Sequence, residues 1–193
     1  MRGRVRTAVL ISGAGTNMEA LVRAARAPDY PAEIVLVLSN RPAAGGLARA
    51  EALGVATAVV DHRAHPDRGT FERAVHAELE ARDVELVALA GFMRVLTPWF
   101  VGRWAGRMVN IHPSLLPRYR GLNTHSRVLE AGDAEHGATV HWVSEDLDGG
   151  EIIAQAGFSV PPGATPDTLA ELVRDVEHTL YPAALRTAAA SLR

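Results

Sequence analysis

Residues 6–17, with the sequence RTAVLISGAGTN, establish the type of fold, because an apolar run is followed by a glycine-rich turn and then by a helical pattern. The apolar run predicts a buried strand, and the pattern after the turn predicts a helix. Apolar runs and helical patterns continue to alternate along the chain, which is typical of βαβ units in a parallel sheet. The predicted strands are residues 6–12, 34–39, 57–60, 86–91 and 108–111, and the predicted helices are residues 17–27, 46–53, 70–82 and 98–104.

The pattern changes toward the C-terminus. Residues 138–143 and 151–160 predict two strands without a helix between them, and hence a hairpin at an antiparallel edge of the sheet. Residues 167–192 have a helical pattern that we expect to break at Pro182. The hydroxyl of Thr70 is expected to cap the helix that begins there. We therefore predict a single α/β domain over residues 1–193, a Rossmann-like, mostly parallel open sheet with helices on both faces and an antiparallel edge.

The composition excludes several classes of function. The 193 residues include 20 Lys+Arg and 22 Asp+Glu, so we expect no basic surface for nucleic acid or an anionic membrane. The absence of cysteine excludes disulfides, thiolate metal sites and a cysteine nucleophile. All 20 basic residues are Arg, which excludes a Schiff-base lysine and a P-loop lysine. With no signal-peptide pattern and no apolar run of about 20 residues, we expect a cytoplasmic protein.

The glycine turn predicts a site for a phosphate group. Gly13 and Gly15 allow a tight turn at the start of a helix, where backbone N–H groups and the helix dipole favour an anion. Thr16 and Asn17 add side-chain donors. A dinucleotide fingerprint would need a third glycine where Met18 stands and an acidic residue at the end of the second strand, and the sequence has neither. A mononucleotide or sugar phosphate is therefore favoured, and an ordinary βα turn stays an alternative.

A second cluster of polar residues follows the later strands. Asn110 and His112 stand two positions apart in an extended segment and should project to the same face, beyond the carboxyl end of the sheet. An amide that stabilises an oxyanion, beside an imidazole that exchanges a proton near pH 7, suits acyl transfer. Asp148 precedes two glycines, and its carboxylate would favour the protonated form of His112. A structural imidazole and a surface turn stay the alternatives.

Metal binding is a weaker hypothesis. Two sets of residues contain metal-ligating side chains, the first being Asp61, His62 and His65, and the second His136 and His141. Neither set has a recognised zinc spacing, so we expect no metal.

Five motifs resemble one family of enzymes over nearly the whole chain. These are VLISGAGTN at residues 9–17, LAGFMRVL at 89–96, NIHPSLLPRYRGL at 110–122, VSEDLDGGEII at 143–153 and EHTLYP at 177–182. The third motif is diagnostic of folate-dependent formyltransferases, and together the motifs are similar to those of the phosphoribosylglycinamide formyltransferases.

The resemblance implies an activity. Members transfer the formyl group of 10-formyltetrahydrofolate, a co-substrate, to the glycinamide amine of 5'-phosphoribosylglycinamide in de novo purine (IMP) biosynthesis, without a metal. The partners would be these small molecules, with no nucleic acid and no membrane, and the protein would be a monomer or a homodimer. Residues 1–105 would form the half that binds the phosphorylated substrate, and residues 106–193 the folate and catalytic half.

The resemblance also implies roles for individual residues. The catalytic residues would be Asn110, His112 and Asp148, acting by direct transfer without a covalent enzyme intermediate. The phosphorylated substrate would be bound by Gly15, Thr16, Asn17, Glu177, Arg174 and Asp175. The folate would be bound by Arg68, Met93, Arg94, Val95, Leu96, Asn110, Ser144, Glu145, Asp146, Leu147 and Asp148.

Three other functions remain as alternatives. A formyltetrahydrofolate hydrolase would use the same three catalytic residue types but typically has an additional N-terminal domain, and a methionyl-tRNA formyltransferase would have a C-terminal RNA-binding domain and a basic surface. We expect neither in 193 residues with a net charge of −2. A nucleotide-binding module without catalytic activity is the third alternative, and the presence of all three catalytic residue types argues against it.

Overall fold

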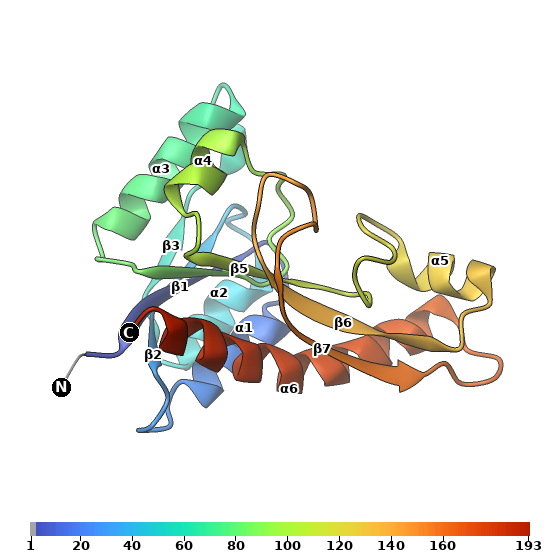
Figure 1. Ribbon diagram of the computed structural model, residues 1–193. Coiled ribbons are helices and arrows are strands. Elements are labelled where there is room, and N and C mark those ends of the chain that lie inside the picture. The colour runs from blue at the N-terminus through green and yellow to red at the C-terminus, as the bar shows by residue number, and fades with distance from the viewer. Residues whose placement is uncertain (1–2) are drawn as a thin grey trace.

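Seven strands form one sheet in the computed structural model, which describes residues 3–193; residues 1 and 2 of the predicted domain lie outside the described part (Figure 1). The strand order is β3-β2-β1-β4-β5-β6-β7, with parallel pairing from β3 to β5 and antiparallel pairing of β5 with β6 and of β6 with β7. The predicted α/β fold with an antiparallel edge is therefore confirmed. The strands are β1 (Val5–Ile11), β2 (Ala32–Ser39), β3 (Thr57–Val59), β4 (Leu86–Leu89), β5 (Met108–His112), β6 (Glu135–Trp142) and β7 (Ile152–Ser159).

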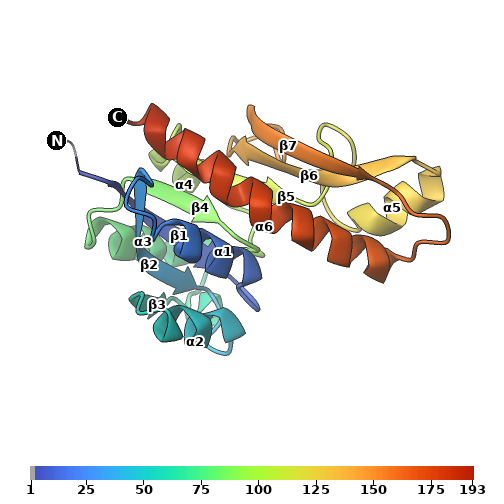
Figure 2. The ribbon, with the colours of Figure 1, turned by 90° about the horizontal axis from the view of Figure 1, so that it is seen from below.

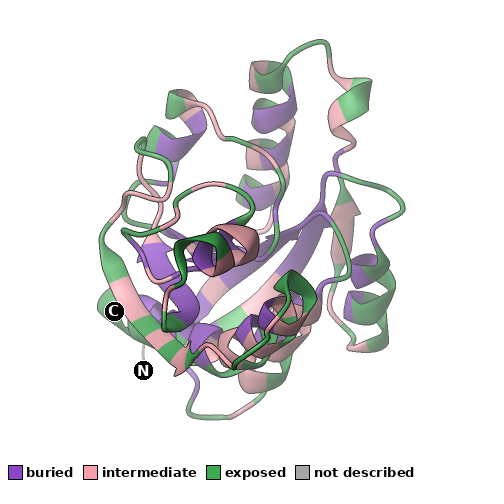
Figure 3. Ribbon diagram, turned by 90° about the vertical axis from the view of Figure 1, so that its right-hand side faces the viewer, coloured by how far each residue is buried: buried purple, intermediate pink, exposed green. Residues whose placement is uncertain are grey.

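Helices cover both faces of the sheet (Figures 1 and 2). Residues of β1 alternate between two cores, because successive side chains of a strand point to opposite faces. Val9 packs with side chains of α1, α2 and α6, whereas Leu10 packs with side chains of α3 and α4. Figure 3 shows the buried residues on the central strands and on the inner sides of the helices. The helices are α1 (Thr16–Ala24), α2 (Gly45–Ala52), α3 (Arg68–Glu80), α4 (Pro98–Arg103), α5 (Thr124–Ala131) and α6 (Pro166–Ser191), with a 3-10 turn at His62–Ala64.

The strand order places a crevice at the centre of the sheet. From β1 the chain moves outward to β2 and β3 and then returns to β4 on the other side of β1. In open α/β sheets, ligands bind at such a reversal of strand order, outside the carboxyl ends of the strands. The segments that follow β1 and β4 are the glycine turn and the start of the LAGFMRVL motif.

Three local predictions were wrong. Helix α3 begins earlier than expected, and its cap is Asp67, whose carboxylate accepts a hydrogen bond from the Thr70 backbone N–H at 2.7 Å. Helix α5, which the sequence analysis did not predict, begins after Asn123 in a left-handed conformation (φ 57°) and has no side-chain cap bond. Helix α6 continues through Pro182.

Tertiary contacts explain why α6 does not break. A proline inside a helix typically costs about 3 kcal/mol because it removes a backbone donor and crowds the preceding turn. Here the Tyr30 hydroxyl donates to the Pro182 carbonyl at 2.7 Å, and the Tyr181 hydroxyl donates to the Leu89 carbonyl of β4 at 2.8 Å. The buried stripe of α6 includes Val173 before the proline and Leu185 after it. The sheet therefore holds both halves of the helix in line. Within residues 3–193, none of the helices combines the length and the apolarity needed to cross a bilayer.

We predict that Tyr181→Phe lowers the free energy of unfolding by about 1 kcal/mol, because a fully buried hydroxyl loses its bond to Leu89 and leaves that carbonyl with fewer partners. Urea denaturation would measure the change. Thr187→Val on the exposed side of the same helix is the control and should change the free energy by less than about 0.5 kcal/mol. Equal stability of Tyr181→Phe and the unmodified protein would contradict the proposed anchoring of α6.

Candidate active site

The glycine turn after β1 is built for close backbone approach. Gly15 precedes α1 in a left-handed conformation (φ 74°), and a Cβ at this position would lie 2.7 Å from the Cα of Gly46. The Gly46 N–H donates to the Gly13 carbonyl at 3.0 Å, so a backbone hydrogen bond from the start of α2 holds the turn in place. Any larger residue at position 15 would be strained and would collide with backbone. The turn is therefore a fixed cradle at the N-terminal end of α1.

A pocket of about 350 Å³ opens over this turn. It is lined by residues 13–17, by Ala90 and Gly91 after β4, and by Arg174 of α6. Backbone N–H groups at the start of α1 and the exposed guanidinium of Arg174 both favour an anion. Three residues predicted to bind the phosphorylated substrate, Gly15, Thr16 and Asn17, are thus brought together, and Arg174 lies with them.

Glu177 joins this group through Asn17. The Asn17 Nδ2 donates to the Glu177 Oε2 at 2.9 Å, and burial raises the pKa of the Glu177 carboxyl. Glu177 does not itself line the pocket and reaches it through Asn17, where a carboxyl of raised pKa can exchange hydrogen bonds with hydroxyl groups as donor or acceptor. Asp175, which was also predicted to bind the substrate, is exposed on α6 and does not line the pocket.

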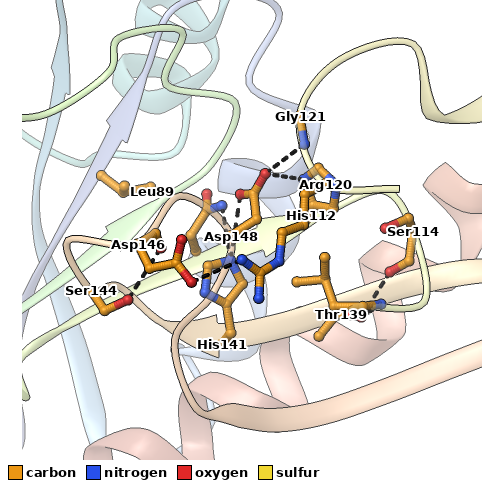
Figure 4. Close-up of polar contacts among 12 residues, drawn as sticks. Leu89, His112, Ser114, Arg120, Gly121, Thr139, His141, Ser144, Asp146 and Asp148 are labelled. Atoms are coloured by element: carbon orange, nitrogen blue, oxygen red, sulfur yellow. Dashed lines mark hydrogen bonds and ion pairs between the residues drawn. The ribbon is translucent and has the colours of Figure 1, made fainter. Parts of the chain in front are cut away.

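The predicted imidazole and carboxylate, His112 and Asp148, lie side by side (Figure 4), and the predicted amide of Asn110 lies close to them through His141. Asn110 is the register partner of Leu89, the residue before Ala90 of the pocket wall. The His112 Nε2 lies 2.8 Å from the Tyr119 carbonyl, to which it donates, and the Nδ1 lies 3.5 Å from the Asp148 Oδ2. The Tyr119 carbonyl fixes the ring orientation, so the Nδ1 is the nitrogen that faces the carboxylate.

The sequence analysis missed the catalytic potential of His141, considering it only as a metal ligand. His141 is 2% exposed, and its Nδ1 donates to the Trp142 carbonyl at 3.0 Å. Its Nε2 is then free to accept a hydrogen bond from the Asn110 Nδ2 at 3.3 Å, which orients the amide. Burial lowers the pKa of His141, and the nearby Asp148 carboxylate raises it by a smaller amount. A neutral imidazole therefore supports the Asn110 side chain.

The site lies on a face of the sheet. Strand β6 is antiparallel to β5, and its register places His141 opposite Asn110 and Thr139 opposite His112. Residues directly opposite each other point to the same face. Asn110 and His112 belong to β5 itself, and His112 is its last residue, so the polar cluster lies at the carboxyl end of this strand with its side chains on one face of the sheet. The signal that could have identified His141 is the strand pattern of residues 138–143, which would have had to be paired with the NIH segment.

The DGG motif, residues 148–150, places Asp148 next to the sheet face that carries Asn110 and His112. Asp148 has a left-handed backbone (φ 51°), and its Oδ2 accepts a hydrogen bond from the Gly121 N–H at 2.9 Å. A Cβ at Gly150 would lie 1.7 Å from the Trp142 carbonyl oxygen, so only glycine fits there. The loop also carries Asp146, which pairs with Arg120 at 2.8 Å. Two segments distant in sequence are thereby joined around the side chains predicted to be catalytic.

The residues predicted to bind folate lie on four segments, one of which is β5 with Asn110. In the segment after β4, Met93 is 58% exposed and Val95 is 59% exposed, whereas Arg94 and Leu96 are half-buried. The Arg94 guanidinium lies 5.9 Å from the centre of the Phe71 ring. In the loop after β6, Leu147 is 58% exposed, Glu145 and Asp146 are exposed, and Ser144 donates to the Asp146 carbonyl. Arg68 is exposed at the start of α3. Exposed apolar side chains on two loops are available to an apolar ligand.

The metal hypothesis finds no support in the geometry. Within the part of the chain that the structure describes, no cluster of three or more His, Cys, Asp or Glu residues could hold a metal ion. His136 lies 2.9 Å from His125, and His141 is engaged by Asn110. These imidazoles take part in pairwise polar contacts.

The geometry defines a class of protein, an α/β enzyme that transfers an acyl group. Its reacting groups lie next to a pocket for an anionic ligand. The chain matches the formyl transferase family over residues 5–185 and belongs to that family.

Several known proteins are similar to this chain over most of its length. The "phosphoribosylglycinamide formyltransferase" of Escherichia coli is 44% identical over 174 residues, which cover 90% of this chain and 82% of that protein. The crystal structure of "phosphoribosylglycinamide formyltransferase" from Brucella melitensis is 49% identical, with a TM-score of 0.93 over 97% of this chain and 96% of that chain. The "trifunctional purine biosynthetic protein adenosine-3" of Gallus gallus is 50% identical over 186 residues, but the chain spans only 18% of that protein's length.

We predict that Asp148→Asn lowers the pKa of His141 further below its ordinary value of about 6.5, because the variant removes the carboxylate that favours the imidazolium while the burial remains. NMR titration of the histidine ring protons would follow His141 in both proteins. A pKa of His141 that rises in the variant would contradict the arrangement of these two groups. Asp29→Asn, on the exposed surface and paired with Arg186, is the control and should leave the His141 titration unchanged.

Proposed function

We propose that this protein transfers the formyl group of 10-formyltetrahydrofolate to the amine of 5'-phosphoribosylglycinamide, a step of de novo purine (IMP) biosynthesis. The observation that carries the proposal is the cluster of Asn110, His112 and Asp148 beside the glycine-turn pocket. The names of similar bacterial proteins and of the Brucella melitensis structure support the choice of acceptor. We further propose a cytoplasmic monomer or homodimer that acts on these small molecules.

The positive charge and backbone donors of the glycine-turn pocket suit the phosphate of the acceptor. Its phosphate would accept hydrogen bonds from the backbone of Gly15 and from Thr16 and Asn17, with Arg174 adding a positive charge. Glu177, joined to Asn17, would bind ribose hydroxyls. Asp175 is left out of this proposal because it does not line the pocket.

The donor would occupy the space between the segment after β4 and the loop after β6. Met93, Val95 and Leu147 expose apolar side chains that can pack against the pteridine and benzoyl rings. Backbone groups of residues 144–148 would hydrogen-bond the pteridine, and Arg94 and Leu96 would complete the wall. Arg68, exposed at the start of α3, would lie along the anionic end of the folate.

The chemistry we infer is direct transfer. The amine attacks the formyl carbon, and negative charge develops on the formyl oxygen. The Asn110 amide and the protonated His112 imidazole stabilise this oxyanion, while Asp148 stabilises the imidazolium and relays protons through water. The bond from the formyl carbon to N10 of the folate then breaks, N10 takes up a proton, and the acceptor amine loses one.

The test is formyl transfer with purified protein, 10-formyltetrahydrofolate and 5'-phosphoribosylglycinamide. Release of formate without formylation of the acceptor would indicate the hydrolase instead, and formylation of methionyl-tRNA alone would indicate the tRNA enzyme. Absence of all three activities would favour the nucleotide-binding module.

We predict that Asn110→Ala lowers kcat about a hundredfold, since the loss of one oxyanion donor typically costs about 3 kcal/mol of transition-state stabilisation. The KM values should change little, because the oxyanion forms only during the reaction. Circular dichroism and thermal melting would check that the variant is folded. Near-normal turnover in a folded variant would refute the role of Asn110.

A further inference from the structure

Ser12 lies where the two ligand-binding segments meet. It is the last residue before the glycine turn and is 3% exposed. Its backbone N–H donates to the Gly91 carbonyl at 3.2 Å, and its Oγ accepts a hydrogen bond from the Met93 N–H at 2.8 Å. Ser12 therefore directly precedes the residues that line the acceptor pocket, and it also hydrogen-bonds Met93, the first residue of the proposed folate-binding segment.

A buried amide fixes the direction of the Ser12 hydroxyl. Because the Oγ accepts from Met93, its single hydrogen is available for the Asn40 Oδ1, which lies 2.5 Å away. Asn40 is fully buried at the end of β2, and its Nδ2 lies 3.2 Å from the His62 Nδ1. The hydroxyl thus has a donor on one side and an acceptor on the other, so it cannot turn without losing one of them.

The far end of the folate-binding segment is anchored separately. The Thr97 N–H donates to the Glu72 Oε1 at 2.7 Å, and Glu72, on α3, is 1% exposed. Between the two anchors, the side chains of Met93 and Val95 remain exposed. The backbone of the segment is therefore held at both ends while its side chains stay available to a ligand, and Ser12 is the anchor that also leads into the glycine turn.

We propose that Ser12 is a positioning residue that aligns the acceptor pocket with the folate-binding segment. This inference rests on the proposed function. The Oγ keeps the Met93 backbone at a fixed distance from the glycine turn, so the two substrates meet a preformed arrangement. If the hydroxyl is removed, the Met93 N–H loses its partner and both segments gain freedom, and each substrate must then order the segment that binds it.

The test compares Ser12→Ala with Ser39→Ala. Ser39 is also fully buried, at the end of the neighbouring strand β2, but its hydroxyl donates to the Arg41 carbonyl and accepts from the Arg41 N–H within its own loop. Both variants lose a buried hydroxyl, and only Ser12→Ala removes a link between the two segments. Ser12→Cys keeps the size of the side chain with a weaker acceptor and serves if Ser12→Ala does not fold.

Hydrogen exchange of the full-length chain is the first readout. In Ser12→Ala, amides of residues 13–17 and of residues 91–96 should both exchange faster than in Ser39→Ala. Faster exchange in only one segment, or equal exchange in the two variants, would overturn the proposal. This measurement does not depend on the activity, so it decides the positioning role even if formyl transfer to 5'-phosphoribosylglycinamide is not found.

Steady-state kinetics is the second readout. Ser12→Ala should raise KM for both substrates by about tenfold, which corresponds to about 1.4 kcal/mol for each, with kcat changed by less than about threefold. Ser39→Ala should leave both KM values within about twofold of the unmodified enzyme. A rise in only one KM, or an equal rise in both variants, would indicate a local or merely structural role and would overturn the proposal.

Discussion

The antiparallel pairing of β5 with β6 is the constraint on which the catalytic site depends. In this register Asn110 faces His141, and His112 faces Thr139, so four polar side chains share one face of the sheet. A shift of one residue would turn all side chains of one strand to the opposite face. The buried side chains of Ala138 and Val140 on β6 make such a shift costly, because they pack into the core beneath α6. The hydrophobic core therefore sets the positions of the polar groups.

Backbone contacts that only glycine permits bring the remaining parts to this face. Gly15 fits against Gly46, and Gly150 fits against the Trp142 carbonyl. The first contact fixes the anion pocket, and the second fixes the loop that carries Asp148. The first contact joins two segments that are distant in sequence, and the second joins a loop to β6, the strand before it. A side chain at Gly15 or Gly150 would push the contacting segments apart. The GAG and DGG patterns thus serve the packing of the backbone as well as its turning.

Sequence patterns predict those elements whose structure depends on residues nearby in the chain. The strand-turn-helix pattern around residues 6–17, the alternation that follows it and the final hairpin are local features, and the structure confirms all three. The course of α6 through Pro182 could not be predicted, because Tyr30 and the sheet stabilise it from outside the helix. His141 was missed for a similar reason. Its role follows from a strand register, and the residue has no motif of its own.

The geometry also favours the proposed direct transfer over a covalent intermediate. The hydroxyls near the cluster are engaged elsewhere: Ser114 is fully buried and donates to the Arg118 carbonyl at 2.7 Å, and Thr139 donates to the Ser114 carbonyl at 2.7 Å. Among the described residues, neither hydroxyl is hydrogen-bonded to an imidazole that would activate it as a nucleophile. Ala90 and Gly91 line the anion pocket, and the chain then continues directly into the segment that exposes Met93 and Val95. Two ligands held on adjoining stretches of one loop would lie close enough to react with each other. Their direct reaction would then need no covalent intermediate on a protein side chain.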